Sequence, residues 1–287
     1  MTLTRWTRWI AGALAALAIL IALVVAFFDW NWLREPIARR VSARTGRSFA
    51  INGDLQVHLS LQPRIVANDV VLGNAPWSRD PAMVEIKRVD FRIDLFKLLA
   101  GKVDLPEIAL SEPRVALEVS ATGAANWVFD EKAESKPVEF PPIGQLTIDH
   151  GTATYRDPGN KTDLALELKT PAAGTDTSIF GLELKGTGRY KGLLSAVSAQ
   201  GGALLNLRSA DSPYPIKASG EVGTTRFSID GMLLDPLHFK GEQLNFRIEG
   251  HDLALLYPIT GVPLPRTPAY RFVGFLDHTG DLWAFRR

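Results

Sequence analysis

Apolar and polar residues alternate one by one along most of the chain after its first fifty residues. In segment 55–62, four aliphatic residues alternate with Gln, His and Ser, and segments 89–95 and 164–168 repeat the pattern. A period of two places the two sets of side chains on opposite faces of a β-strand. The chain is therefore expected to be mainly β, with strands that are apolar on one face and polar on the other.

Turn-forming residues such as Asn52-Gly53-Asp54 and Asp157-Pro158-Gly159-Asn160 separate the alternating segments. We expect antiparallel pairing, because parallel neighbours need crossover connections of about a dozen residues or more. After residue 47, helical patterns are confined to 95–101 and 253–259, which are too short to cover a large sheet. The apolar face must then be buried in another way. Two folds stay open at this point: a curled antiparallel sheet that forms a groove or half-barrel, and a closed sandwich or barrel with a dry core.

An uncharged apolar run at 9–28 contains twenty residues. As an α-helix it would be about 30 Å long, which matches the hydrocarbon core of a bilayer. Tryptophan and phenylalanine lie at its ends, as is typical of membrane interfaces. A cleaved signal peptide is the alternative, but its apolar core is normally about 7–15 residues long. We expect an uncleaved transmembrane helix at 9–28, preceded by a cytoplasmic tail at 1–8.

Residues 29–47 combine apolar residues at helical spacing with several arginines, and Gly46 is a stop signal. This pattern predicts a short amphipathic helix that lies at the membrane surface. The residues expected at that surface are Trp30, Trp32, Arg34, Arg39 and Arg40. Counted alone, the arginines after the span would place the body in the cytosol, although large domains can be translocated regardless of charge.

No catalytic constellation stands out in the sequence. The chain has no cysteine, which excludes disulfides and thiol chemistry. Its five histidines form no metal-ligand spacing, and nucleophile-elbow and phosphate-loop motifs are absent. A net charge of +1 does not suggest nucleic-acid binding. We expect neither an enzyme nor a cofactor.

Several short motifs occur in an order that resembles the AsmA family of bacterial envelope proteins. They are Thr45-Gly46-Arg47, Gly73-Asn74 with Trp77, Leu98-Leu99 with Gly101, Pro113, Asn126-Trp127 with Phe129, and Gly261-Val262-Pro263-Leu264-Pro265. The resemblance implies an inner-membrane anchor and a body in the periplasm. It also implies similarity to bridge-like lipid-transfer proteins, whose curled sheets hold lipid in an apolar groove. Gly73-Asn74 is expected to turn the chain, with Trp77 packing across the end of the sheet.

With this resemblance, the groove is favoured over the closed core, and the expected function is phospholipid binding or transfer in support of outer-membrane biogenesis. The residues expected to face lipid are Leu55, Val57, Leu59, Phe91, Ile93, Val115, Leu117, Val119, Leu164, Leu166, Leu182 and Phe246. The alternative is a scaffold or regulator of outer-membrane protein assembly that transfers no lipid. The periplasmic body is expected at 48–287, with a sub-boundary near 131–142. Because AsmA relatives are usually longer, the chain is expected to be a short form or a truncated product.

Overall fold

The computed structural model describes residues 9, 12, 16, 28–129, 143–171, 180–203, 213–235, 240–279 and 282–286. The predicted transmembrane helix at 9–28 falls almost entirely outside these residues, as do the predicted cytoplasmic tail and the sub-boundary near 131–142. In the described part of the chain, no helix is both long enough and apolar enough to cross a bilayer.

Two consecutive helices, η1 (Trp30–Leu33) and α2 (Arg34–Thr45), occupy the region where the sequence predicts a helix. The carboxylate of Asp29 caps η1 by accepting a hydrogen bond from the N–H of Asn31 at 3.0 Å. Gly46 ends α2 with φ 65°, a left-handed conformation that glycine adopts without steric cost. The other helices are α3 (Leu95–Leu99), η3 (Leu253–Leu256) and α4 (Tyr257–Thr260).

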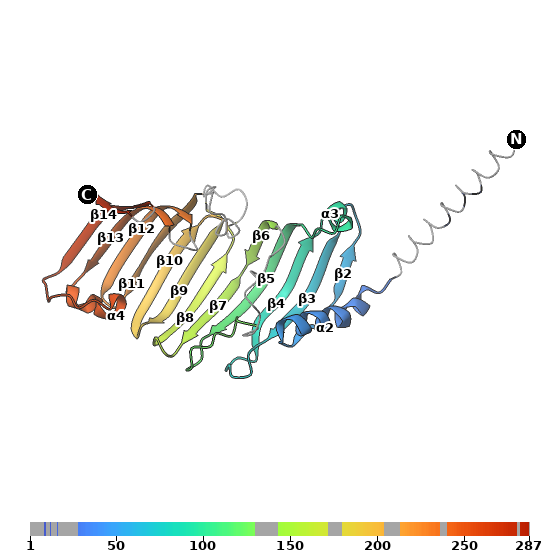
Figure 1. Cartoon of the computed structure of the whole chain (residues 1–287), viewed down its shortest axis with the longest axis horizontal. Coiled ribbons are helices and arrows are strands. Elements are labelled where there is room, and N and C mark those ends of the chain that lie inside the picture. Colours follow the sequence, from blue (N-terminus) through green and yellow to red (C-terminus); the bar gives the residue numbers. More distant parts are fainter. Residues whose placement is uncertain are drawn as a thin grey trace.

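The 15 strands of the described chain form one sheet, in the order β1-β3-β4-β5-β7-β8-β9-β10-β11-β12-β13-β14-β15, with β2 paired to β3 and β6 paired to β5. They are β1 (Phe49–Ile51), β2 (Leu55–His58), β3 (Arg64–Gly73), β4 (Ala82–Arg92), β5 (Leu105–Glu118), β6 (Ile143–Asp149), β7 (Gly151–Asp157), β8 (Thr162–Lys169), β9 (Leu182–Tyr190), β10 (Leu193–Gly201), β11 (Tyr214–Val222), β12 (Thr225–Asp235), β13 (Lys240–Gly250), β14 (Tyr270–Thr279) and β15 (Leu282–Arg286). The strands lie side by side in an elongated layer, with α2 and α3 at opposite strand ends (Figure 1). The mainly β prediction is confirmed.

The sheet is open, because its order runs from β1 to β15 without returning. Most neighbouring strands are antiparallel, but β5 pairs in parallel with β6 and with β7. The prediction of a purely antiparallel sheet is therefore wrong at this point. Residues 119–142 lie between β5 and β6, and this connection is long enough for the crossover that parallel pairing needs.

Three residues in left-handed conformation lie in one line across β3, β4, β5 and the junction of β6 with β7. Asp69 in β3, Glu112 in β5 and His150 between β6 and β7 have φ of 50°, 49° and 51°. The cross-strand partners immediately before and after each of these residues are paired with one another. Asp69, Glu112 and His150 therefore lie in one line with Lys87 of β4. We call Asp69, Lys87, Glu112 and His150 the kink row.

At the kink row, the apolar residues of a strand switch between even and odd sequence numbers. In β5 they are the even-numbered Ile108 and Leu110 before it, and the odd-numbered Val115 and Leu117 after it. A Cβ built on Gly151 would lie 2.7 Å from Cγ2 of Ile148, so positions on the two sides of the row share one face. The left-handed residues therefore keep the apolar face continuous where simple alternation would invert it.

Few aliphatic side chains are fully buried in the described part of the chain. Val66, at 1% exposed, and Leu55, at 5%, belong to this small set. The described strands form a single sheet, so no second sheet covers the apolar face. Most of the apolar side chains of the strands are instead half-buried. Among the described residues, the apolar face of the sheet is therefore only partly covered.

Candidate functional site

Two rows of cross-strand partners run along the apolar face without a polar or charged side chain. The first row crosses ten strands through Val84, Val115, Ala153, Leu166, Gly186, Val197, Gly220, Phe227, Ile248 and Phe272. The second crosses eight strands through Gly151, Leu168, Leu184, Ala199, Ala218, Ile229, Phe246 and Gly274. At about 4.8 Å between strands, the first row is about 43 Å long.

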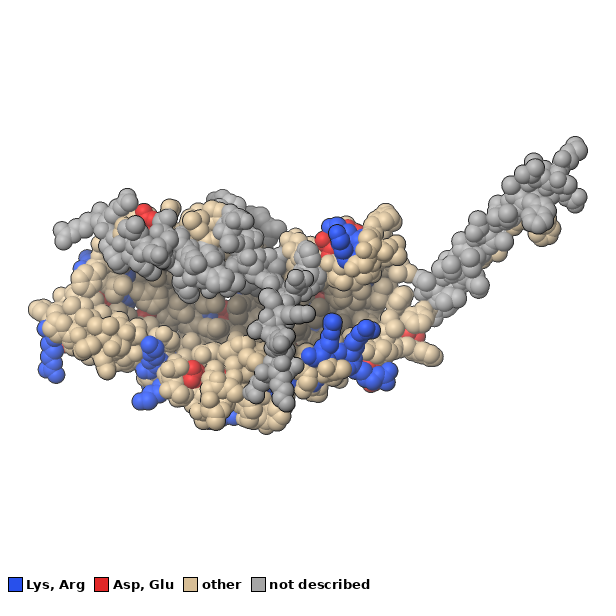
Figure 2. All heavy atoms as spheres, viewed as in Figure 1, with Lys and Arg blue, Asp and Glu red and all other residues tan. Residues whose placement is uncertain are grey.

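Glycines in these rows let larger neighbours close over the sheet. A Cβ on Gly186 would lie 2.7 Å from Cδ2 of Leu166 and 2.8 Å from Cγ1 of Val197, so both side chains lean over this glycine. Phe227 covers Gly220 in the same way, with ring atoms 3.1 Å from such a Cβ. The space-filling view in Figure 2 shows a hollowed face with few charged side chains across the described strands. The rows therefore pack laterally and still leave an extended apolar surface.

The opposite face is polar. A shallow hollow of about 440 Å³ lies over β9 to β12 and is lined largely by charged and hydroxyl side chains, such as Lys185, Lys217 and Asp230. Among the described residues, no group of three or more His, Asp or Glu side chains is placed to hold a metal ion. The extended apolar surface is thus the more distinctive feature of the sheet.

Most residues predicted to face lipid lie at apolar-face positions of strands. These are Leu55, Val57, Phe91, Val115, Leu117, Leu164, Leu166, Leu182 and Phe246. Leu55 and Leu182 are only 5% and 8% exposed, so they belong to the buried set. The other three candidates lie just beyond the ends of β2, β4 and β5. They are Leu59, Ile93 and Val119.

The residues predicted at the membrane surface fall into two groups. Trp32 is 76% exposed, and Arg39 and Arg40 are exposed on α2. Arg34 instead donates from Nη1 to the carbonyl oxygen of Gly53 at 3.0 Å, so its guanidinium holds α2 to the start of β2. Trp30 is half-buried and meets the ring of Phe28 edge-on, with centroids 5.0 Å apart. Only the first group is free to contact another surface.

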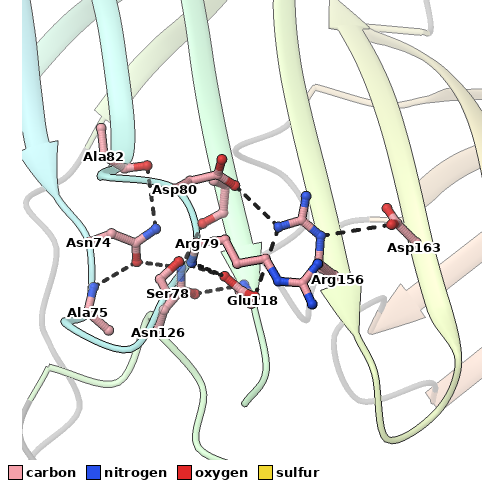
Figure 3. Close-up of polar contacts among 11 residues, drawn as sticks. Asn74, Ala75, Ser78, Arg79, Asp80, Ala82, Glu118, Asn126, Arg156 and Asp163 are labelled. Carbon is pink, nitrogen blue, oxygen red and sulfur yellow. Dashed lines mark hydrogen bonds and ion pairs between the residues drawn. The ribbon is translucent and has the colours of Figure 1, made fainter. Parts of the chain in front are cut away.

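A buried polar cluster closes one end of β5 (Figure 3). Asn126, which is 0% exposed, donates from Nδ2 to Oδ1 of Asn74 at 2.9 Å and to the carbonyl oxygen of Ala116 at 2.7 Å. Its Oδ1 accepts from the N–H of Glu118 at 3.0 Å. These bonds lie beyond the last paired residues of β4 and β5. Asn126 therefore satisfies backbone groups that have no strand partner there.

The carboxylate of Glu118 holds the same region together. Its Oε2 accepts from Oγ of Ser78 at 2.6 Å and from the N–H of Arg79 at 3.1 Å, and Arg156 lies 3.9 Å from Oε1. Burial alone raises the pKa of Glu118, but these hydrogen bonds and the nearby arginine charge outweigh it, and the pKa is lowered. Arg156 also lies 3.5 Å from Asp80, so the cluster ties the β3–β4 loop to β7.

Two of the motifs shared with the AsmA family contain both an asparagine and a tryptophan: Asn74 with Trp77, and Asn126 with Trp127. In each, the tryptophan is more exposed than the asparagine. Trp77 is 41% exposed and Trp127 is 39% exposed, with the Trp127 ring 6.3 Å from that of Tyr155. The sequence predicts a structural role for the Gly-Asn turn, but not that Asn74 bonds directly to Asn126. The asparagine of each motif is therefore the residue that joins the two turns.

The resemblance of the motif order to the AsmA family is confirmed by the comparisons. The model of the AsmA family matches residues 5–276. The chain is similar to the AsmA family protein YhjG of Escherichia coli (strain K12), at 31% identity over 306 aligned residues that cover 94% of this chain and 44% of that protein. It thus spans less than half the length of this relative, and no solved structure matches it. The chain belongs to the AsmA family.

Proposed function

We propose that this chain is a non-catalytic phospholipid-binding protein of the bacterial envelope, which holds acyl chains along its apolar face. The observation that carries the proposal is the first apolar row, which crosses ten strands without a polar side chain. Water-soluble proteins rarely leave so large a continuous apolar surface without a ligand or partner.

The dimensions of the rows suit an acyl chain. One leaflet of a bilayer core is about 15 Å thick, and the first row is about 43 Å long, so lipid tails can lie along it. Each methylene removed from water contributes about 0.8 kcal/mol. Curling of the open sheet into a groove or half-barrel would increase this contact. The lipid headgroups would stay at the open margins of this groove, where polar side chains and water are available.

Membership of the AsmA family supports a role in the envelope and in outer-membrane biogenesis. The predicted span at 9–28 would hold the chain in the inner membrane as a single-pass protein, with the sheet in the periplasm. Transfer of phospholipid over a distance is part of the proposal. The chain covers 44% of its relative, so the activity of the whole protein does not follow from the similarity.

Photo-crosslinking on neighbouring residues of β10 tests this function. Val197 lies in the first row, while Ser198 is exposed on the opposite face of the same strand. A benzophenone amino acid at position 197 of the full chain should crosslink to phospholipid in cells, and one at position 198 should not. Protein adducts without lipid adducts at position 197 would refute the proposal and favour the scaffold alternative.

Charge substitution gives a second measurement. Val197→Glu should lower the phospholipid that copurifies with the full chain several-fold, whereas Ser198→Glu should leave it unchanged. Both variants are compared by urea unfolding, so that a loss of lipid can be separated from a loss of folding. Val197→Glu that stays folded and retains its lipid would contradict the proposed site.

A further inference from the structure

Large apolar side chains are exposed at both ends of β2, the strand that pairs only with β3. At its start, η1 is attached through Oδ1 of Asn31, which accepts from the N–H of Leu55 at 3.0 Å, and Trp32 of η1 is 76% exposed. Just beyond its end, Leu59 and Leu61 are 54% and 70% exposed. The sheet therefore presents apolar groups along this edge.

A second loop adds to this edge. The N–H of Ile93 donates to the carbonyl oxygen of Pro63 at 3.1 Å, which joins the β2–β3 turn to the segment that leads into α3. In α3, Phe96 is 67% exposed and Leu99 is 78% exposed. Figure 1 places α3 at the ends of the strands beside β2 and β3.

Two hydrogen bonds within the α3 loop stabilise this exposed arrangement. Oδ1 of Asp94 caps the helix by accepting from the N–H of Lys97 at 3.1 Å. Nζ of Lys97 donates to Asp104 at 2.7 Å across the loop. The cap and the ion pair thus give Asp94, Lys97 and Asp104 partners within the loop, while Phe96 and Leu99 are exposed. A surface of this kind can be inserted into an apolar medium without leaving these polar groups unpaired.

The same edge carries positive charge. Helix α2 packs beside β1, where the N–H of Phe49 donates to Oγ of Ser42 at 2.9 Å. Arg39, Arg40 and Arg44 are exposed on α2, and within the described chain none of the three takes part in an ion pair. Figure 2 shows lysine and arginine side chains gathered near this part of the molecule. Exposed arginines beside apolar and aromatic side chains suit the headgroup region of an anionic bilayer.

We propose that this edge docks on the surface of an anionic phospholipid bilayer. The membrane edge is defined by Trp32, Leu59, Leu61, Phe96 and Leu99, with Arg39, Arg40 and Arg44. Docked in this way, β1 and β2 lie along the bilayer surface, and the two apolar rows run away from that surface. Lipid tails that leave the bilayer then meet apolar side chains directly. This inference rests on the proposed function and adds where the apolar face meets its source of lipid.

Chain continuity favours a bilayer over a protein as the occupant. Only Asp29 separates the apolar run at 9–28 from η1, so a span at 9–28 would hold the membrane edge next to the lipid headgroups. The two exposed loops would then insert beside the anchor. A protein partner would have to compete for the same position.

The absence of cysteine allows single labelled positions in the full chain. Leu61→Cys and Leu99→Cys carry an environment-sensitive nitrobenzoxadiazole label, with Leu194→Cys and Val273→Cys, at 67% and 57% exposed, as controls. The protein is reconstituted in nanodiscs of phosphatidylethanolamine and phosphatidylglycerol. We expect blue-shifted emission and several-fold stronger quenching by doxyl-labelled lipid at positions 61 and 99 than at the controls. Equal accessibility of all four labels to aqueous iodide would overturn the docking.

A change of lipid and the addition of a protein partner distinguish the remaining outcomes. In nanodiscs of phosphatidylcholine alone, lipid quenching at position 99 should fall at least twofold, and unchanged quenching would overturn the preference for anionic lipid. If labels at 61 and 99 are shielded only when a protein partner is added, a protein surface replaces the bilayer. Lipid crosslinks at Val197 with water-exposed labels at 61 and 99 would reject the docking and keep the proposed function. Docking without crosslinks at Val197 would reject the function.

Discussion

Removal of the Asn126 side chain should destabilise the protein far more than its small size suggests. In Asn126→Ala, the carbonyl oxygen of Ala116 and the N–H of Glu118 each lose the partner that now lies 2.7 Å and 3.0 Å away. The site is 0% exposed, so water does not replace these bonds without rearrangement of the turn. Oδ1 of Asn74 in the neighbouring loop also loses one of its donors and keeps the N–H of Ala75.

The magnitude follows from the two orphaned backbone groups. A buried polar group without a partner costs about 1–3 kcal/mol, so Asn126→Ala should lower the free energy of unfolding by about 2–6 kcal/mol. Asn245→Ala is the matched control, because the Asn245 amide forms an exposed hydrogen bond to Asp230 at 3.2 Å. Exposed substitutions of this kind usually change stability by about 0.5 kcal/mol or less.

Urea unfolding of the full chain in mild detergent measures both variants, with tryptophan fluorescence and far-UV circular dichroism as probes. Hydrogen exchange should also show faster exchange in the β3–β4 loop of Asn126→Ala, because that loop is held through Asn74. If Asn126→Ala and Asn245→Ala lose the same stability, the reasoning that Asn126 replaces a missing strand partner is refuted.

Two further predictions concern charge and backbone conformation. The side-chain hydrogen bond from Arg64, with a smaller one from Arg88, lowers the pKa of Asp90, so Asp90 stabilises the fold above about pH 4 and this contribution is lost as the pH falls. Asp90→Asn should therefore be less stable than the unmodified protein at pH 7, and acid titration of unfolding should show the two curves converging below pH 4. Glu112→Val should be about 1 kcal/mol less stable than Glu112→Gly in urea unfolding, because a β-branched residue resists φ 49°. Both Glu112 variants lose the ion pair with Lys87, so equal stability would show that the backbone at the kink row is unstrained.

Alternation was sufficient to predict the strands and most of the apolar face. It correctly places Val115, Leu117 and Leu166 on that face, because a period of two is a local property of each strand. It could not predict that the face continues across the kink row, since this depends on left-handed residues in three separate segments. The parallel pairing of β5 also depends on contacts between residues far apart in the sequence.

The polar cluster shows a different limit of sequence reasoning. Gly73-Asn74 and Asn126-Trp127 were recognisable as motifs, but their bond joins turns 52 residues apart. A sequence pattern gives each turn its residue types without saying which turns meet. The arginines of α2 present the same difficulty, because Arg34 binds a backbone carbonyl while Arg39 and Arg40 stay exposed. Their spacing alone does not distinguish these roles.

The single-layer sheet makes the length of this architecture adjustable. From β7 onward, successive strands are joined to their neighbours in sequence order, so each added hairpin would need only the preceding edge for pairing. One hairpin extends such a sheet by about 10 Å and leaves earlier strands unchanged. The free energy of folding then accumulates unit by unit, as in solenoid proteins, rather than through one central core. Evolution can therefore set the reach of such a protein by hairpin duplication, at little cost to the part already built.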